Sequence, residues 1–433
     1  MTEAVSTDRY IWPLVAKERI AADGPMVLAE GRGSRVKDQR GRSYLDLSSG
    51  ITRAASLGYG NEEIADAVHA QLRKLHYAGT VEYQADVVFR LAEKLAELTP
   101  GPLGPTYFTE SGTAANEAAF KLARYYQQAT GKPRAYKVIS RWNAYHGAIG
   151  TPMAVSDWLG VRLPADPGTP GVSFVPGPTC YRSSSGTGEP PPTSSYLDSL
   201  EQQILHEGPE LVAALIAEPV MQANGVQVPP ADYFPAVREI CSKYDVLFIA
   251  DEVITGFGRT GKWFAVEHWG VQPDIITMAK ALTAGYMPAG AAIVSEEIWA
   301  ALEAFPDVHT FGGHAAAGAA ALAAIEIYER EGLIERAREV GEQLLGLLRR
   351  LEAHEVVGEV RGLGMWAAVD FTSDPQTRAP LDFDQVHAIV LAARERGLIV
   401  TRNGGAIELA PRLDMPLEEI EEGVEILDRA IGG

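Results

Sequence analysis

The strongest constraint on the fold is a set of short runs that contain almost no polar residue. Residues 211–217, 246–250 and 275–278 form such runs, and polar residues bound the first two on both sides. A strand with one solvated face alternates polar and apolar residues, whereas a parallel strand buried on both faces does not. Patterns typical of helices lie between the runs, as in residues 115–126. This alternation predicts an α/β fold with a mostly parallel central sheet flanked by helices.

A second α/β pattern occupies the two ends of the chain. Residues 35–38 and 43–47 flank a turn and predict a hairpin, and strands and helices alternate again after residue 330. We predict a large domain over residues 60–325 and a small α/β domain built from residues 1–59 and 326–433. Residues 177–195 are rich in Ser, Gly and Pro and predict a long surface loop, either functional or a plain connection.

Charge and cysteine content exclude several classes of protein. The 433 residues include 38 Lys and Arg against 57 Asp and Glu, a net charge of −19. Such a charge repels nucleic acid and anionic membranes. Two cysteines, Cys180 and Cys241, fit a reducing compartment. The first residues lack the pattern of a signal peptide, and no apolar run reaches the roughly 18 residues of a membrane helix. We therefore expect a cytoplasmic protein.

The first segment with chemical potential follows a short predicted strand at residues 106–109. Ser111, Gly112 and Thr113 stand immediately before the helix at 115–126. Free amides at a helix N-terminus, together with hydroxyl groups, form a pocket for phosphate. An ordinary Ser or Thr helix cap is the alternative explanation.

Two further segments follow buried strands. Asp251 comes directly after the run 246–250, and Lys280 closes the strand that we predict at 275–278. Partial burial favours the neutral amine of Lys280, the form that a Schiff-base nucleophile needs; a lysine reaching out to solvent is the alternative. Residues 256–261 match the dinucleotide pattern G-x-G-x-x-G, but five residues separate them from the strand and no helix start follows. We interpret these glycines as a turn.

Together the three segments supply a phosphate pocket, a carboxylate and an amine, which are the groups that pyridoxal phosphate requires. The combination resembles the class III aminotransferases of the fold-type-I pyridoxal-phosphate superfamily, roughly from Arg42 to Ile420. The motifs that carry the resemblance are SGTAANEAAFKLAR, RWNAYHG, IAEPVMQANGV, DEVITGFGRTG, PDIITMAKALTAGYMPAGA, HTFGGH and ELAPRL. In series they are far more specific than any one of them alone.

The resemblance implies a role for each matching residue of the cofactor site. Lys280 resembles the lysine that binds the cofactor aldehyde and later moves the proton, and Asp251 resembles the partner of the ring nitrogen. Val253 and Tyr145 match the residues on the two ring faces. The phosphate contacts would be Ser111, Gly112 and Thr113.

Three more residues follow from the same resemblance. Thr310 resembles a residue that reaches the phosphate of the neighbouring subunit, which implies a homodimer with shared active sites and leaves a tetramer open. Glu218 lies close to the site in relatives, and His146 lies beside Tyr145 in the motif; each is also compatible with a purely structural role. No metal site is predicted.

The residue Ile254 points to one branch of the family. Glutamate-using relatives tend to have Asp-Glu-Val-Gln-Thr-Gly, whereas this chain has Asp-Glu-Val-Ile-Thr-Gly, similar to the ω-transaminase or β-amino acid:pyruvate branch. The resemblance implies ping-pong transfer from an amine or an ω- or β-amino acid to a keto acid such as pyruvate. The alternatives are a racemase, aminomutase or decarboxylase of the same fold and, from residues 256–261 alone, a nicotinamide-dependent oxidoreductase.

A keto acid needs a cation for its carboxylate, and arginine gives bidentate recognition. Arg402 matches the mobile substrate arginine of the branch, with Arg53 and Arg412 as competing candidates. Trp158 and Phe311 are predicted to line the pocket, with ordinary packing as the alternative. The chain departs from the usual family pattern at Tyr59, Ala114, Ala315 and Arg412, where relatives have His, Glu, Pro and Pro.

Overall fold

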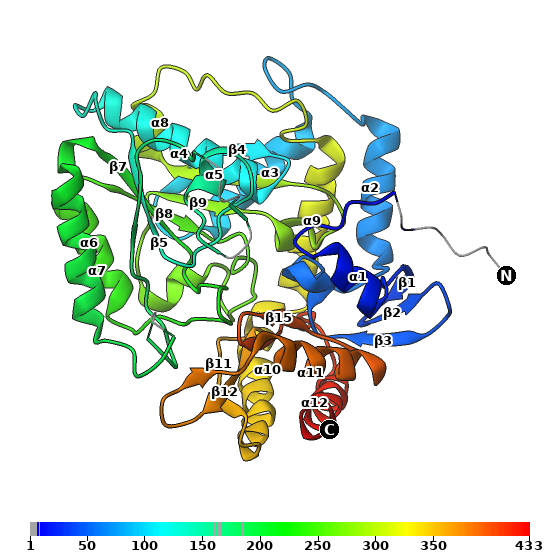
Figure 1. The fold of residues 1–433 in the computed structure, drawn as a ribbon. Coiled ribbons are helices and arrows are strands. Elements are labelled where there is room, and N and C mark those ends of the chain that lie inside the picture. The colour runs from blue at the N-terminus through cyan, green and yellow to red at the C-terminus, as the bar shows by residue number, and fades with distance from the viewer. Residues whose placement is uncertain (1–6, 8, 159–160, 163–166, 184–185) are drawn as a thin grey trace.

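A seven-stranded sheet forms the centre of the larger lobe (Figure 1). The computed structural model describes residues 7, 9–158, 161–162, 167–183 and 186–433. The strands are β4 (Leu103–Thr109), β10 (Gly290–Ser295), β9 (Ile275–Met278), β8 (Leu247–Asp251), β7 (Val212–Ala217), β5 (Lys137–Arg141) and β6 (Val172–Val175), in that spatial order. Only β10 runs antiparallel to its neighbours. The predicted mostly parallel sheet is confirmed.

Every residue of β7, β8 and β9 is buried, because helices cover both faces of the sheet. Alternate side chains of these strands belong to two separate cores. The first core packs against α4 (Gly112–Ala129). The second core packs against α3 (Asp86–Leu98), α6 (Thr193–Glu207), α7 (Tyr233–Lys243) and α9 (Ala315–Arg330). The continuous apolar runs of the sequence thus follow from burial on two sides.

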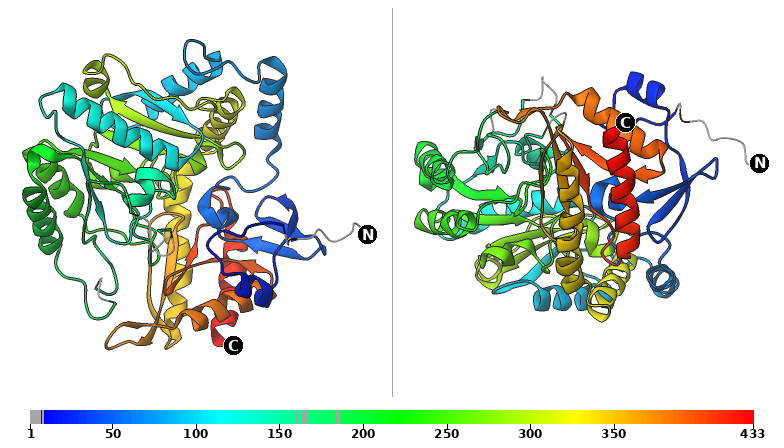
Figure 2. Two further views of the ribbon diagram at one scale, coloured as in Figure 1. Left: turned by 45° about the horizontal axis from the view of Figure 1, so that its top comes forward. Right: turned by 90° about the horizontal axis from the view of Figure 1, so that it is seen from below.

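The smaller lobe combines both ends of the chain (Figure 2). Strand β3 (Ser43–Asp46) pairs in parallel with β14 (Leu398–Ile399), in a sheet with β1 (Leu28–Arg32) and β2 (Arg35–Asp38). A second sheet has the order β11 (Val357–Gly362), β12 (Ala367–Asp374), β16 (Ala406–Leu409), β15 (Thr401–Asn403), with β13 (Ala379–Pro380) beside β12. The domain boundaries at residues 59 and 325 stay predictions.

The remaining helices complete the two lobes. They are α1 (Lys17–Asp23), α2 (Glu62–Lys74), α5 (Gly150–Ala154), α8 (Glu296–Ala300), α10 (Leu333–Leu348), α11 (Phe383–Glu395) and α12 (Leu417–Gly432). The predicted loop at residues 177–195 ends earlier than expected, because α6 begins at Thr193. Within the described part of the chain, no helix has both the length and the apolar character needed to cross a bilayer.

Candidate active site

A cavity lies beyond the ends of strands β8 and β9, beside the start of α4. The carboxyl ends of parallel strands are where open α/β sheets bind ligands. The residues that line the cavity are Ser111, Gly112, Thr113, Asn116, Tyr145, His146, Glu218, Val220, Asp251, Val253, Ile254, Thr255, Ala279 and Lys280. The structure therefore brings together every predicted cofactor residue except Thr310.

The start of α4 forms the anion-binding end of the cavity. Ser111 precedes the first residue of this 18-residue helix, and its side chain accepts a hydrogen bond from the Ala114 amide at 3.2 Å. A Cβ atom on Gly112 would lie only 2.8 Å from Val253 Cγ1, so only glycine lets the start of α4 pack this closely against Val253. The first amides of a helix lack partners within the helix and favour a phosphate group.

Asp251 is held in place by three hydrogen-bond partners. Its Oδ2 atom accepts from Asn116 Nδ2 at 2.8 Å and lies 2.7 Å from His146 Nδ1, and its Oδ1 atom accepts from the Val253 amide at 3.0 Å. The side chain is only 4% exposed. These contacts fix the direction of the carboxylate while Oδ1 keeps capacity for another donor.

Sequence reasoning missed Asn116 and Thr277, which orient that carboxylate. Thr277 Oγ1 donates to Asn116 Oδ1 at 2.6 Å, so the amide presents its nitrogen to Asp251 and to the His146 carbonyl. The position of Asn116 in the sequence is the signal that could have identified it. Asn116 follows Thr113 by three residues, about one helical turn, and therefore faces the same way.

The expectation that Lys280 closes a strand is wrong. Strand β9 ends at Met278, and Lys280 begins a short 3-10 helix (Lys280–Thr283) with a φ of 42°. The chain must leave the sheet abruptly to bring the amine into the cavity, and this left-handed conformation is rare for a residue with a side chain. Burial, followed by the positive charge of Arg53, lowers the pKa of Lys280 to about 7. A large fraction of the amine is then neutral near neutral pH.

Glu218 and Tyr145 form the wall beside Lys280. Glu218 Oε1 accepts from the Tyr145 amide at 3.1 Å and Oε2 from the Gln222 amide at 3.2 Å. Burial raises the pKa of the Glu218 carboxyl group. The Tyr145 ring meets Trp158 edge to face, with centroids 5.7 Å apart. Glu218 thus fixes the backbone that carries Tyr145. Trp158 contacts the Tyr145 ring but is not among the residues that line the cavity.

The structure does not bring Arg402 to the cavity. Its guanidinium lies 3.5 Å from the centroid of the Phe383 ring and donates to the Gly404 carbonyl at 3.1 Å. Successive side chains of a strand point to opposite faces, so the next residue, Asn403, points the other way and accepts from Trp158 Nε1 at 3.1 Å. Arg412 forms an ion pair with Asp414 at 2.6 Å.

Arg53 is the candidate arginine whose hydrogen bonds lead toward the cavity wall, through Gln222 to Glu218, although it does not itself line the cavity. Its side chain is 8% exposed, forms an ion pair with Glu408 and donates to Gln222 Oε1 at 3.3 Å. Its neighbour Ala54 lies against Gly285, whose amide donates to the Lys280 carbonyl at 3.3 Å.

The turn that carries Arg53 has an unusual backbone. Ser49, Ile51 and Arg53 have φ values of 48°, 65° and 61°. Positive φ is a strained conformation for a β-branched residue such as Ile51, and strain of this kind is concentrated at functional sites. Asp46 holds the turn by accepting from the Ser48 amide at 2.7 Å and the Gly50 amide at 2.8 Å.

Tyr59, one of the departures from the family pattern, supports this turn. Its hydroxyl donates to Asp46 Oδ2 at 2.6 Å. Asp46 is buried, and a neighbouring phenol provides a charge-assisted hydrogen bond that offsets its desolvation. The substitution of His by Tyr therefore has a structural explanation in the support of the Ser49–Arg53 turn.

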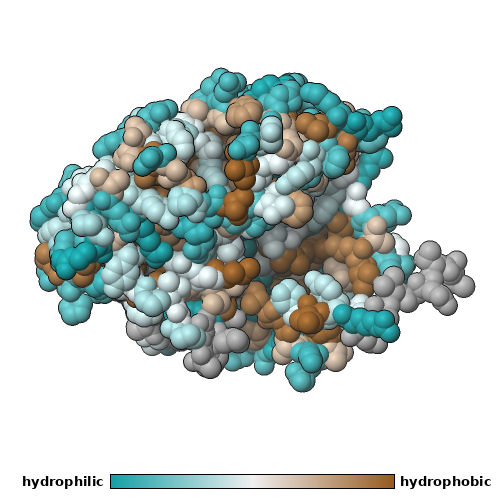
Figure 3. Space-filling view, turned by 90° about the horizontal axis from the view of Figure 1, so that it is seen from above, coloured by the Kyte–Doolittle hydropathy of each residue, from teal (hydrophilic) through white to brown (hydrophobic). Residues whose placement is uncertain are grey.

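Thr310 and Phe311 lie away from the cavity of their own chain. Phe311 is 61% exposed, and the Thr310 carbonyl accepts from the Tyr77 hydroxyl at 3.1 Å. Figure 3, a view from above, shows hydrophobic surface within a hollow of the molecule. Large exposed apolar side chains cluster around the segment that carries Thr310 and Phe311. They are Tyr77, Val81, Tyr83, Phe89, Val308 and Phe311.

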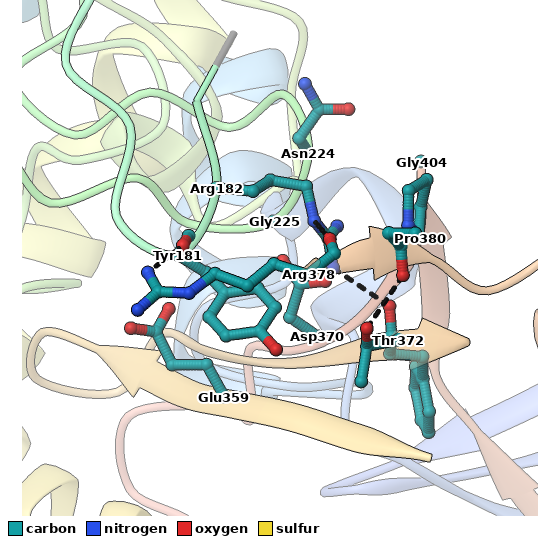
Figure 4. A network of polar contacts seen from close by, with 12 residues as sticks. Tyr181, Arg182, Asn224, Gly225, Glu359, Asp370, Thr372, Arg378, Pro380 and Gly404 are labelled. Carbon is teal, nitrogen blue, oxygen red and sulfur yellow. Dashed lines mark hydrogen bonds and ion pairs between the residues drawn. The ribbon is translucent and has the colours of Figure 1, made fainter. Parts of the chain in front are cut away.

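A network of ion pairs fixes the turn that follows Gln222 (Figure 4). Arg361 donates to the Asn224 and Gly225 carbonyls, both at 2.6 Å, and pairs with Asp370 at 2.7 Å. Arg182 reaches the same Asp370 at 2.8 Å from the loop before α6. The network ties two loops of the larger lobe to strands β11 and β12, and so holds Gln222 in reach of Arg53.

The glycine pattern at residues 256–261 forms turns, as predicted. The element that follows is a 3-10 helix (Ala265–Trp269), so no α-helix starts there. Arg259 within the pattern is 1% exposed and donates to the Met365 carbonyl at 2.9 Å and the Pro411 carbonyl at 2.6 Å. This segment anchors the smaller lobe and is not arranged as a dinucleotide site.

The residues present fit pyridoxal phosphate. Gly112 brings the start of α4 against Val253 where any side chain would clash, and His146 Nε2 is buried without a partner among the described residues, beside the carboxylate that would meet the ring. Asp251 and Lys280 supply the acid and the amine within one cavity. The fold and this site define a fold-type-I pyridoxal-phosphate-dependent enzyme.

Comparison with known proteins gives the family. The chain belongs to the class III aminotransferases, whose family description matches residues 18–431. It is 35% identical to the taurine–pyruvate aminotransferase of Bilophila wadsworthia, over 99% of this chain and 96% of that protein. It is 36% identical to the diaminobutyrate–2-oxoglutarate transaminase of Halomonas elongata, over 94% and 90%. A PLP-bound amine transaminase from an uncultivated Pseudomonas species superposes with a TM-score of 0.94, at 36% identity over 99% of both chains.

The protein is therefore a pyridoxal-phosphate-dependent transaminase that acts on amine and keto-acid substrates. The racemase, aminomutase and decarboxylase alternatives are not favoured by these relatives.

Proposed function

We propose that this transaminase transfers an amino group from an amine, or from an ω- or β-amino acid, to pyruvate in a ping-pong reaction. The observation that carries the proposal is the convergence of Lys280, Asp251 and the start of α4 on one cavity. The similarity to a taurine–pyruvate aminotransferase and to the structure of an amine transaminase supports the choice of substrates. Ile254 in the cavity wall supports the same branch of the family.

The cavity residues would hold the cofactor from three sides. The amides and hydroxyls of Ser111, Gly112 and Thr113 would bind the phosphate. Asp251 would keep a proton on the ring nitrogen, and Val253 and Tyr145 would pack on the two ring faces. When bound, pyridoxal phosphate supplies an aldehyde that takes up the amino group and a ring that withdraws electrons from the reacting carbon.

Lys280 would carry the proton transfers. Its lowered pKa provides a neutral amine that accepts a proton from the donor carbon and delivers it again within the same cavity. Lys280 shares its cavity with Glu218 and Asp251, so the amine can reach a substrate bound there. His146 and Asn116 act as positioning residues through Asp251.

Arg53 would bind the carboxylate of the keto acid. Among the three candidate arginines it is the one whose contacts lead to the cavity, through Gln222 to Glu218. Its guanidinium has five N–H donors, of which Glu408 and Gln222 take two, so donors remain for an acid. Arg402 and Arg412 serve other contacts.

The apolar face around Tyr77 and Phe311 would form a homodimer interface. Contiguous exposed apolar surface of this kind marks an interaction site, and the family resemblance implies that Thr310 reaches the phosphate of the partner subunit. A Thr310→Ala variant should bind the cofactor more weakly. Size-exclusion chromatography coupled to light scattering would give the oligomeric state.

An absorbance spectrum tests the function directly. The holoenzyme should show a visible cofactor band that bleaches with an amine donor and returns with pyruvate. Lys280→Ala should lose both the band and turnover, whereas Lys262→Ala, a matched change at an exposed lysine, should retain them. A wild-type band that bleaches with amines but ignores every keto acid would contradict the proposal.

The choice among the arginines has its own test. Arg53→Ala should raise the KM for pyruvate at least about tenfold, the effect of losing a charge-assisted hydrogen bond or two, while the amine half-reaction persists. Arg402→Ala is the matched control and should change the KM for pyruvate little. The reverse pattern would assign the keto acid to Arg402.

A further inference from the structure

Tyr328 is a buried tyrosine on α9 whose hydroxyl group meets the chain segment that carries Lys280. The hydroxyl donates to the Ala281 carbonyl at 2.8 Å and lies 2.7 Å from Ser56 Oγ. A phenol has a single proton to donate. Because that proton goes to the Ala281 carbonyl, the Ser56 hydroxyl must be the donor to Tyr328. Two hydrogen bonds therefore run in series from Ser56 through Tyr328 to the residue that follows Lys280.

The segment that begins at Lys280 needs support from outside. Lys280 has a φ of 42°, a left-handed conformation that is strained for a residue with a side chain. The amides of Ala284 and Gly285 donate to the carbonyls of Ala281 and Lys280, at 3.1 and 3.3 Å, but these bonds stay within the same turn. Among the described residues, Tyr328 is the one side chain that donates to the backbone of the 3-10 helix beginning at Lys280. It thus fixes this helix to the rest of the fold.

Ser56, the other partner of Tyr328, is itself held in place. Ser56 is buried, its amide donates to the Ala54 carbonyl at 2.9 Å, and its carbonyl accepts from the Leu413 amide at 2.8 Å. Ser56 therefore offers Tyr328 a donor of fixed position. Hydrogen bonds in series strengthen one another in a buried environment, so the bond from Tyr328 to Ala281 is better supported than an isolated one.

We propose that Tyr328 is a positioning residue for the proton transfers of Lys280. Its bond to the Ala281 carbonyl keeps the Lys280 backbone, and with it the amine, at the place from which the amine reaches the donor carbon. Tyr328 is not among the residues that line the cavity, so it acts through Lys280 and not on the substrate. A displacement of about 1 Å at a reacting group can cost about a hundredfold in rate. The inference rests on the proposed function, which gives Lys280 the proton transfers.

The first test uses the apoprotein and needs no turnover. Tyr328→Phe removes the hydroxyl and keeps the ring. Amide hydrogen exchange in the peptide from Lys280 to Gly285, followed by mass spectrometry, should become at least about threefold faster, because a lost hydrogen bond eases local opening. Peptides from β7 and β8 should keep their rates and so exclude a global loss of stability. The visible band should also appear about tenfold more slowly after addition of pyridoxal phosphate, because the attacking amine is less well placed.

The second test follows the proton transfer in the holoenzyme. A single turnover is measured with an amine donor that carries hydrogen or deuterium on the carbon bearing the amino group. In Tyr328→Phe the half-reaction per bound cofactor should be about tenfold slower, with an isotope effect at least as large as in wild type. Tyr196→Phe is the matched control and should keep the wild-type rate. Tyr196 lies on α6, is 3% exposed, and its hydroxyl lies 3.3 Å from Thr179 Oγ1.

A second variant tests the same pair of hydrogen bonds from its other end. Ser56→Ala removes the donor to Tyr328 and leaves the bond from Tyr328 to the Ala281 carbonyl. It should slow the half-reaction in the same direction but less, by about threefold. Because the substitution is small, it also guards against a folding defect in Tyr328→Phe.

A third measurement asks whether Tyr328 acts through the lysine. In Lys280→Ala, methylamine in solution can serve as the base in place of the missing side chain. Adding Tyr328→Phe to that variant should leave the methylamine-dependent rate unchanged, because the group that Tyr328 positions is absent. A further slowing equal to the one seen with Lys280 present would overturn the proposal, since it would mean that Tyr328 shapes the cavity as a whole.

The outcomes separate this inference from the function on which it rests. If Tyr328→Phe keeps wild-type exchange in the Lys280 peptide, or a wild-type half-reaction, the role of Tyr328 is overturned and the transaminase function stands. A slower half-reaction that has lost its isotope effect also overturns it, because the defect would then lie outside the proton transfer. If no amine bleaches the band of the wild type, the proposed function fails, and the role of Tyr328 falls with it.

Discussion

The amine of Lys280 should titrate far below an ordinary lysine in the protein without cofactor. Its pKa falls from 10.5 to about 7, first because the amine is buried and second because Arg53 is near. The difference between these two pKa values corresponds to about 5 kcal/mol in the free energy of ionisation. At pH 8 roughly 90% of the amine is then neutral, against less than about 1% for an ordinary lysine.

The rate at which the apoprotein takes up pyridoxal phosphate reports this ionisation, because only the neutral amine attacks the aldehyde. The rate of appearance of the visible band should rise from pH 6, reach half its limit near pH 7 and level off above about pH 8. Arg53→Gln removes a positive charge and should shift the midpoint to higher pH.

The same shift makes a prediction for stability. Between about pH 7 and 10.5 the unfolded chain carries a proton on Lys280 that the folded apoprotein lacks, so the contribution of this group to the free energy of unfolding rises with pH across that window. An uptake rate that keeps increasing tenfold per pH unit up to pH 10 would refute the assignment, since it would mean that Lys280 ionises as an exposed lysine does.

Three further variants test contacts described above. Asn116→Ala should reduce kcat about tenfold and weaken cofactor binding, measured by titration, because Asp251 loses a hydrogen bond of about 1.5–3 kcal/mol. Tyr59→Phe should raise the KM for pyruvate without slowing the amine half-reaction; an unchanged KM would mean that the turn does not position Arg53. Arg259→Met should lower the free energy of unfolding, followed in urea, by about 2–5 kcal/mol, because two buried carbonyls lose their donor.

Much of the cofactor site could be predicted from local sequence. The serine, glycine and threonine at 111–113 precede a helix, and Asp251 directly follows an apolar run, so each could be placed at the end of a strand without knowledge of the rest of the chain. Parallel strands end at one edge of the sheet. That rule is enough to predict that these groups meet. It does not predict that Lys280 stands in a short 3-10 helix and not at the end of the strand.

The acid-binding side of the site could not be predicted in the same way. The family pattern favours Arg402 over Arg53. In the structure Arg402 lies in a short strand, where a shift of one residue turns a side chain to the opposite face. The structure places Asn403 on the inner face and Arg402 on the outer one. Arg53 meets Glu408 across 355 positions of sequence, a contact that no local pattern reports.

The sequence by itself determined the class of fold and the chemistry of the cofactor. A strand that is buried on both faces must be apolar. The phosphate, ring nitrogen and aldehyde of the cofactor require a helix N-terminus, a carboxylate and a lysine after the ends of such strands. Only the tertiary structure brought Arg53 and Glu408 together as a buried ion pair. Those side chains come from the two ends of the chain, so they meet only when the smaller lobe packs against the sheet. Local periodicity predicts helices and strands, but it does not predict contacts between residues that are far apart in the sequence.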